Sequence, residues 1–154
     1  DFRSARSHLD ASLKLYEELG VEHRKAHVLL SLAELHLEAR ELQLAKELVE
    51  QAIQLATNLD ERMNIAVGWQ LLGRIAVFTS DPKQAERHFA TAISMLESLQ
   101  ASDRLVDAYT EYGRLLEGRG DDKAAVRYFK LALDTSRGTK QAEQKSEDES
   151  AASA

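Results

Sequence analysis

Histidine and carboxylate side chains are the residues of this sequence that could bind a metal ion. His23 and His27 lie four residues apart, about one helical turn, and Glu34 follows one to two turns later. Two imidazoles at that spacing can share a zinc ion, but no third ligand follows in a recognised spacing. Arg24 and Lys25 also stand between the two histidines. The sequence therefore favours solvent-facing or groove-facing histidines and predicts no metal site.

Motifs for catalysis are also absent from the sequence. It contains no phosphate-binding G-x-x-x-x-G-K-[ST], no dinucleotide-binding G-x-G-x-x-G and no nucleophile motif G-x-S-x-G. No Ser or Asp has a spacing that would join a nucleophile to its base, and carboxylate pairs such as Glu17–Glu18 fit helix ends. With no Cys, disulfides and thiolate metal sites are excluded. We therefore expect neither enzymatic activity nor a cofactor.

The composition indicates a helical protein. One Pro and seven Gly among 154 residues leave little material for the turns of a many-stranded sheet. No apolar run approaches the ~18 residues of a membrane-spanning helix, so we expect no membrane insertion. The start, "DFRSARSHLD", has neither Met nor an apolar signal core, which predicts an excised fragment of a larger protein. The absence of Cys is compatible with a cytoplasmic location.

Charge argues against nucleic acid as a direct partner. The net charge is −6, and the sequence shows no run of more than two consecutive Lys and Arg residues. Phosphate contacts need clustered Lys and Arg, so an acidic domain of this kind binds nucleic acid poorly.

Apolar and small residues recur every forty positions. A shift of the sequence by that length aligns four columns, which hold Ala5, Ala45, Ala85 and Ala125; Leu9, Val49, Phe89 and Phe129; Ser12, Ala52, Ala92 and Ala132; and Leu13, Ile53, Ile93 and Leu133. Upstream, Ala33, Gly73 and Gly113 also align. Such a fixed period is the signature of a repeat architecture.

Each repeat unit is predicted to form two helices, because apolar residues recur at three- and four-residue steps. We expect first helices at 23–39, 62–79 and 103–118, second helices at 42–59, 83–99 and 122–137, and one more helix at 3–19 that matches a second helix. "SDP" at 80–82 and "GRGDD" at 118–122 supply capping residues. The boundary at 39–41, with neither Gly nor Pro, is the least marked.

Small residues explain how the two helices of a unit can approach closely. Gly73 and Ala85 are expected at the contact, with Trp69, Phe89 and Ile93 filling the space around it. A single hairpin cannot bury its apolar face alone, so stacked neighbours must supply the core.

This pattern, W-x2-L-G followed by A-x3-F-x2-A, resembles the tetratricopeptide repeat. It is present as Trp69, Leu72, Gly73, Ala85, Phe89 and Ala92; as Tyr109, Tyr112, Gly113, Ala125, Phe129 and Ala132; and more weakly as Leu29, Leu32, Ala33, Ala45, Val49 and Ala52. The usual period is about 34 residues, so this is a long variant. The long repeats of bacterial transcription regulators and signalling ATPases, and some eukaryotic scaffolds, look similar. His36 takes the place of the family's large aromatic residue, which favours a core position.

The resemblance implies an all-α, right-handed superhelix of three and a half helical hairpins. Its parts would be a half repeat at 3–20, repeats at 22–60, 61–100 and 101–137, and a polar tail at 138–154 that is disordered or marginally helical. It also implies a concave groove lined by the first helices. The family's groove positions fall on His27, Leu30, Glu34, Leu37, Val67, Gln70, Arg74, Val77, Asp107, Thr110, Arg114 and Glu117.

The side chains at the groove positions indicate which kind of ligand would fit. Glu34, Arg74 and Arg114 occupy equivalent positions in successive repeats and should form a row. The guanidinium groups of that row can hold carboxylates. Aliphatic residues would form an apolar floor in the first two repeats, so an acidic segment with aliphatic anchors would fit. The alternative is that Arg74 pairs with Glu34, and Arg114 with Glu117 or Asp107, merely solubilising this face. Some relatives hold the terminal carboxylate of chaperone tails with a clamp of Lys, Asn and Arg. Only Arg74 is basic among the matching positions, so binding of chaperone tails is disfavoured; these positions are Leu30, Glu34, Arg74, Asp107 and Glu111.

The sequence leaves three functions open. The favoured one is a non-catalytic module that binds a protein or peptide segment within a larger cytoplasmic protein. The second is a self-association module of a transcriptional regulator or signalling protein, which would form a homodimer through the open ends, including the outward side of 122–137 with Val126 and Leu133. The third is an accessory domain of an enzyme.

Overall fold

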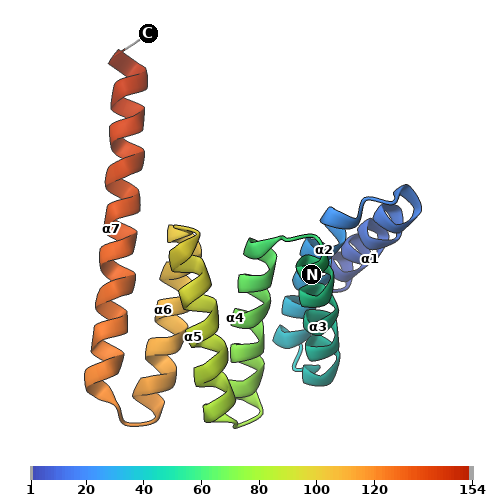
Figure 1. The fold of residues 1–154 in the computed structure, drawn as a ribbon, viewed down its shortest axis with the longest axis horizontal. Coiled ribbons are helices and arrows are strands. Elements are labelled where there is room, and N and C mark those ends of the chain that lie inside the picture. Colours follow the sequence, from blue (N-terminus) through green and yellow to red (C-terminus); the bar gives the residue numbers. More distant parts are fainter. Residues whose placement is uncertain (1, 153–154) are drawn as a thin grey trace. The chain divides into compact units, whose positions relative to one another are not determined.

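The computed structural model describes residues 2–152, with side chains described through residue 141. Within that range the chain forms seven α-helices and no strand (Figure 1). The helices are α1 (Phe2–Leu19), α2 (Glu22–Glu38), α3 (Leu42–Asn58), α4 (Arg62–Phe78), α5 (Pro82–Ser98), α6 (Ser102–Gly118) and α7 (Asp122–Ala152). No helix of the described residues is long and apolar enough to cross a membrane.

Predicted and observed helix boundaries agree within one residue, except at the end of α7. Corresponding helices begin forty residues apart, at Glu22, Arg62 and Ser102 for the first helices of the repeats. The exception is that α7 continues to Ala152, through a segment expected to be disordered or marginally helical. That segment contains no Pro and is rich in Ala, Gln, Glu and Lys, which have high helix propensity. Residues 153–154 lie outside the described part.

The same turn joins every pair of consecutive helices. At residues 20, 40, 60, 80, 100 and 120 the φ angle is positive, between 53° and 78°. After each of them, the next amide N–H donates to the carbonyl five residues earlier, as in Glu41 to His36 at 2.9 Å and Asp121 to Leu116 at 3.0 Å. This is the Schellman pattern, which satisfies carbonyls at the end of a helix. Four of the six positions are not glycine, so the boundary at 39–41 forms without the usual turn residue.

Two of these turns also carry a side-chain cap at the start of the next helix. The carboxylate of Asp81 accepts the Gln84 amide at 3.1 Å, and Asp121 accepts the Ala124 amide at the same distance. Pro82 takes the first position of α5, where its missing N–H is not needed. The predicted caps in "SDP" and "GRGDD" are therefore confirmed.

The chain divides into two compact units, Asp1–Met95 and Leu96–Ala154. The core of the first unit joins α2, α3 and α4, and it contains Leu29, Ala33, Ala45, Val49, Ala52 and Leu72. The alanine of the first aligned column is fully buried at both Ala45 and Ala85. These residues are the small and bulky positions that the forty-residue period predicts.

Glycine allows the close approach of the two helices of a hairpin. An added Cβ at Gly73 would lie 3.0 Å from Cδ1 of Phe89, which is buried. In the second unit, an added Cβ at Gly113 would lie 2.6 Å from Cε1 of Phe129. Both glycines therefore provide room for the aromatic ring of the following helix. The sequence predicts Gly73 against Ala85 with Phe89 beside them, and the structure shows Phe89 in contact with Gly73.

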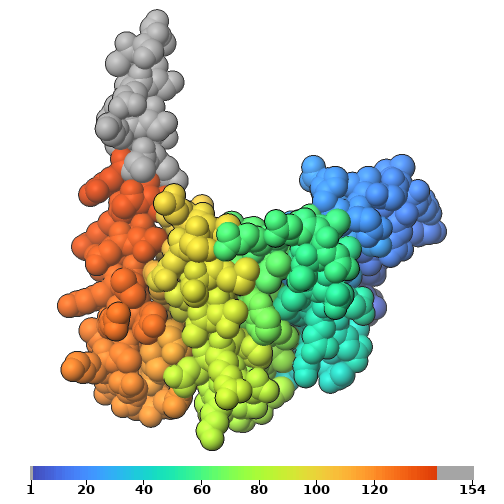
Figure 2. Space-filling view, in the orientation of Figure 1, coloured from blue at the N-terminus to red at the C-terminus, as the bar shows by residue number. Residues whose placement is uncertain are grey.

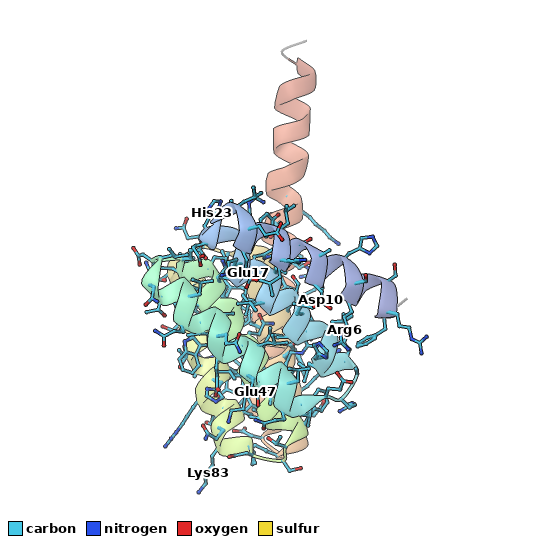
Figure 3. The ribbon with its side chains drawn as sticks, turned by 90° about the vertical axis from the view of Figure 1, so that its right-hand side faces the viewer. Arg6, Asp10, Glu17, His23, Glu47 and Lys83 are labelled. Carbon is cyan, nitrogen blue, oxygen red and sulfur yellow. The ribbon has the colours of Figure 1, made fainter. Side chains whose placement is uncertain are left out.

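Helix α1 is the least buried helix of the first unit. Among its described residues none is buried, although Leu13 packs against the core. Figure 3 shows Arg6, Asp10 and Glu17 along α1, where Arg6 pairs with Asp10 at 3.6 Å. Lys25 of α2 lies 3.8 Å from the Glu17 carboxylate. Partly buried residues such as Leu13 and ion pairs at the edge of the helix thus hold α1 to the rest of the unit.

Candidate partner-binding surfaces

The predicted groove residues of the first two repeats lie on α2 and α4 of the first unit. His27, Glu34 and Val77 are exposed, whereas Val67 and Arg74 are half-buried. Next to Val77, the ring of the exposed Phe78 carries the Arg40 guanidinium 3.8 Å from its centroid. This face therefore presents charged groups beside a small apolar and aromatic patch.

Three predicted groove residues have no surface for a partner. The exposed fractions of Leu30, Leu37 and Gln70 are 3%, 1% and 6%. Leu30 lies against α4, because its Cδ2 would be 3.6 Å from a Cβ placed at Gly68. Leu30 and Leu37 belong to the hydrophobic core. The expectation that they form an exposed apolar floor is thus corrected.

Glu34 and Arg74 meet across neighbouring first helices. The Nη1 atom of Arg74 donates to Oε1 of Glu34 at 2.8 Å, and the Arg74 side chain is 24% exposed. This is the pairing that the sequence analysis gave as the alternative to free guanidinium groups. Exposed pairs stabilise a protein by only about 0–1 kcal/mol, so a carboxylate of a partner could compete with Glu34.

The groove residues predicted in the third repeat lie on α6 of the second unit. Asp107, Arg114 and Glu117 are exposed and Thr110 is half-buried. The Thr110 hydroxyl donates to the carbonyl of Val106 at 2.7 Å, so it is satisfied within its own helix. Arg114 forms no ion pair within the described residues.

A second surface of the first unit was not predicted. Two adjoining hollows, of about 230 and 390 Å³, lie between α3 and α5 above α4. Both are bordered by Lys46, Leu72, Gln84 and His88. The larger one also reaches Trp69. The second helices thus carry a polar-rimmed depression with an apolar floor.

Trp69 and His88 form the aromatic part of that depression. Their rings are stacked, with centroids 5.3 Å apart and planes 30° apart. Burial lowers the pKa of His88, and the charges of Lys46 and Arg87 lower it further, whereas Asp81 acts in the opposite direction. The imidazole is therefore neutral at neutral pH and acts as a flat, hydrogen-bonding surface.

The other histidines are placed as the sequence analysis favoured. His36 is buried, meets the edge of the Phe2 ring at a centroid distance of 6.1 Å, and forms a hydrogen bond to Glu41 through Nδ1. His23 and His27 are exposed. Among the described residues, no group of three or more His, Cys, Asp or Glu could hold a metal ion.

The helical hairpins, their forty-residue spacing and their glycine–phenylalanine contacts define a helical repeat protein. Models of the tetratricopeptide repeat match residues 24–98 and 106–138. The chain is therefore built of tetratricopeptide repeats, which form protein-interaction modules.

Solved structures support the same fold. The chain is similar to BtubC (BKLC) from P. vanneervenii, with a TM-score of 0.74 and 18% identity, over 90% of this chain and 58% of that chain. It is also similar to MamA, with a TM-score of 0.61 and 22% identity over 88% of this chain and 81% of that one. A second MamA structure gives a TM-score of 0.58 at 21% identity, over 88% and 75%. No curated protein sequence matches this chain.

Proposed function

We propose that this chain is a non-catalytic protein-binding module that holds a partner segment on the face formed by α2 and α4. The observation that carries this proposal is the Arg74–Glu34 pair, which joins these two helices at 2.8 Å beside the exposed Val77. A partner carboxylate can replace Glu34 at the guanidinium group, while an aliphatic side chain contacts Val77 and Phe78. The ligand is thus an acidic segment with aliphatic anchors.

The row of equivalent charges extends the proposal to the third repeat. Arg114 lies forty residues after Arg74 in the sequence and is exposed on α6. In the second unit, Arg114 would hold an acidic group of a partner segment in the same way as Arg74 in the first unit. We assign Asp107, Thr110 and Glu117 to the face of α6 that carries Arg114, as polar contacts.

The experiment is a selection of displayed peptides against the immobilised chain, followed by affinity measurements on the enriched sequences. We expect acidic and aliphatic residues in the selected peptides, and we expect Arg74→Glu combined with Arg114→Glu to abolish binding. Arg87→Glu, an exposed change of the same sign on α5, is the control and should leave affinity unchanged. Selected peptides that bind the double variant as tightly as the parent would refute this surface.

The setting we propose is a larger cytoplasmic protein that acts in transcriptional regulation or signalling. The forty-residue spacing of the helix starts supports this setting. It is the period of a long repeat variant, and this sequence resembles the long repeats of transcription regulators and signalling proteins. Expression of the gene product with its flanking regions, followed by identification of adjacent DNA-binding or ATPase domains, tests this part.

Self-association is a second candidate, favoured by the exposure of α1. Leu15 and Leu19 are exposed large hydrophobic residues, and no residue described in this helix is buried. Light scattering after size exclusion should then show a dimer that Leu15→Glu with Leu19→Glu converts to a monomer. Arg74→Glu should leave that dimer intact. A monomeric parent chain rejects this candidate.

A further inference from the structure

The exposed side of α7 carries a regular stripe of basic and aliphatic residues. Six exposed residues follow each other at alternating steps of three and four, and we call them the α7 seam: Lys123, Val126, Lys130, Leu133, Arg137 and Lys140. Val126 and Leu133 are 53% and 50% exposed, although both are large aliphatic residues. In Figure 2 the orange surface of α7 lies open at the edge of the second unit. The three-and-four spacing is that of a helix-packing stripe.

The repeat itself indicates what kind of element covers this stripe. Leu133 belongs to the column that contains Ile53 and Ile93, and Ile93 is buried. In the first unit α4 packs directly over Ile53, since a Cβ at Gly68 would lie 2.5 Å from its Cγ1. The column is therefore the place where the following helix packs, with a small residue at the contact. At Leu133 the described residues supply no such helix.

Charge indicates the chemistry of an element that would pack on the α7 seam. Four of the six seam residues are cations in a chain of net charge −6. Within the described part of the chain, none of these four forms an ion pair, in contrast to Lys46, which lies 3.8 Å from Glu50 on α3. Cations that have no ion-pair partner among the described residues and that flank an apolar stripe favour acidic groups on the element that packs there.

The same charge pattern disfavours two other occupants. A second copy seated on this stripe through its own α7 would bring Lys130 and Arg137 against identical cations, which is repulsive. Helices that lie on membranes use a broad apolar face with Trp, Phe or Leu. The α7 seam offers only Val126 and Leu133, because Ala125 and Ala132 of the same helix are buried.

We propose that the α7 seam is a docking site for an amphipathic helix of another protein. That helix carries acidic residues alternating with aliphatic ones, and a small residue opposite Leu133. The acidic residues pair with Lys123, Lys130, Arg137 and Lys140, while the aliphatic residues cover Val126 and Leu133. The α7 seam shares no residue with the face of α2 and α4, so this proposal can be tested independently of the binding function proposed for that face.

The test uses a labelled synthetic helix of about 18 residues, with Glu and Leu alternating at three- and four-residue steps and Ala and Gln elsewhere. Fluorescence anisotropy with the full chain should show binding that weakens as salt is added, because charges across the interface are screened. Lys130→Glu should weaken binding about tenfold or more. Arg127→Glu, an exposed change of the same size on α7 but outside the seam, should change it by about twofold or less.

Reversing the charges of both the chain and the probe distinguishes a loss of binding from a loss of folding. The chain with Lys130→Glu and Arg137→Glu should bind a probe in which Lys replaces Glu, and the parent chain should not. Equal losses for Lys130→Glu and Arg127→Glu, or no binding of the acidic probe to the parent chain, would overturn the proposal. So would a dimer that Leu133→Glu dissociates, or binding to phosphatidylglycerol vesicles without binding to the probe.

Discussion

The second and third repeats fill the same pair of positions in different ways. In the first unit, Trp69 stacks on His88 beside a hollow of about 390 Å³. Forty residues later, in the second unit, Tyr109 and Tyr128 take these positions, and the Tyr128 ring lies 4.6 Å from that of Tyr112. The Tyr109 hydroxyl donates to the Glu97 carboxylate at 2.7 Å. One pair of positions thus gives an open, titratable surface, and the other a closed aromatic cluster.

The difference shows which parts of a repeat are fixed by packing. Gly73 with Phe89 and Gly113 with Phe129 form the same close contact in both units. Positions 69 and 88, and their counterparts 109 and 128, lie beside that contact and carry unrelated chemistry. The small and bulky columns therefore set the distance between helices, while the neighbouring positions are free to take a function.

The largest effect is expected where the shared contact is removed. Phe89 is almost completely buried, so Phe89→Ala should cost about 4 kcal/mol of unfolding free energy. Phe129 is only half-buried, and Phe129→Ala should cost about 2 kcal/mol. Urea unfolding followed by circular dichroism measures both, and the fluorescence of Trp69, the single tryptophan, reports on the first unit. Equal costs would mean that the two contacts are equally tight.

The next effect concerns the glycine side of the same contact. Gly113→Ala places a Cβ 2.6 Å from the Phe129 ring, and overpacking of this kind costs about 1–3 kcal/mol. Gly118→Ala is the control in the same helix, because nothing lies within 4 Å of its added Cβ. It should be neutral or stabilise by up to about 1 kcal/mol through helix propensity. Destabilisation by Gly118→Ala as large as that by Gly113→Ala would contradict the packing explanation.

Substitution of Tyr109 should have a smaller effect on the free energy of unfolding, and this effect should depend on pH. Burial raises the pKa of Tyr109, and its hydrogen bond to Glu97 raises the pKa further. A raised pKa means that the unfolded chain loses this proton first, so stability is full below about pH 10 and falls as the pH rises above it. Tyr109→Phe should cost about 1 kcal/mol at neutral pH. Denaturant midpoints measured from neutral to alkaline pH should fall less steeply in the variant than in the parent.

The smallest effect is expected in the depression of the first unit. Because the pKa of His88 is lowered, the unfolded chain takes up this proton first, and stability is lost as the pH falls below about 6.5. The stacked imidazolium should also quench Trp69, so a fluorescence titration should give a midpoint below about 6.5. His88→Gln removes that transition, whereas His23→Gln, on an exposed residue, should keep it. A transition that persists in His88→Gln would assign the signal to another group.

The positions of the helices could be predicted from the sequence because one spacing repeats through the chain. Columns such as Ala45, Ala85 and Ala125 identify the buried side of each second helix without knowledge of the fold. The end of α7 could not be predicted in this way, since the residues after 137 do not match the repeat columns. Local polarity suggested a tail that is disordered or marginally helical, and helix propensity without Pro gives a continuous helix to Ala152.

The candidate surfaces were predicted less well than the helices. Leu30 was assigned to an exposed floor from its place in the repeat, but Gly68 lets α4 approach closely enough to cover it. That approach depends on a residue thirty-eight positions away, which the family pattern does not include. The depression at His88 was not predicted. The alignment of His88 with Tyr128, and of Trp69 with Tyr109, was the available signal for it.

The six equivalent turns make the length of this protein easy to change. Because every junction has the same backbone geometry, excising or duplicating forty residues would leave old and new boundaries alike in conformation. Gene duplication could therefore extend the array without a compensating change in any connecting segment. Engineered versions with more or fewer hairpins could be assembled by the same rule, with each cut made at a left-handed residue.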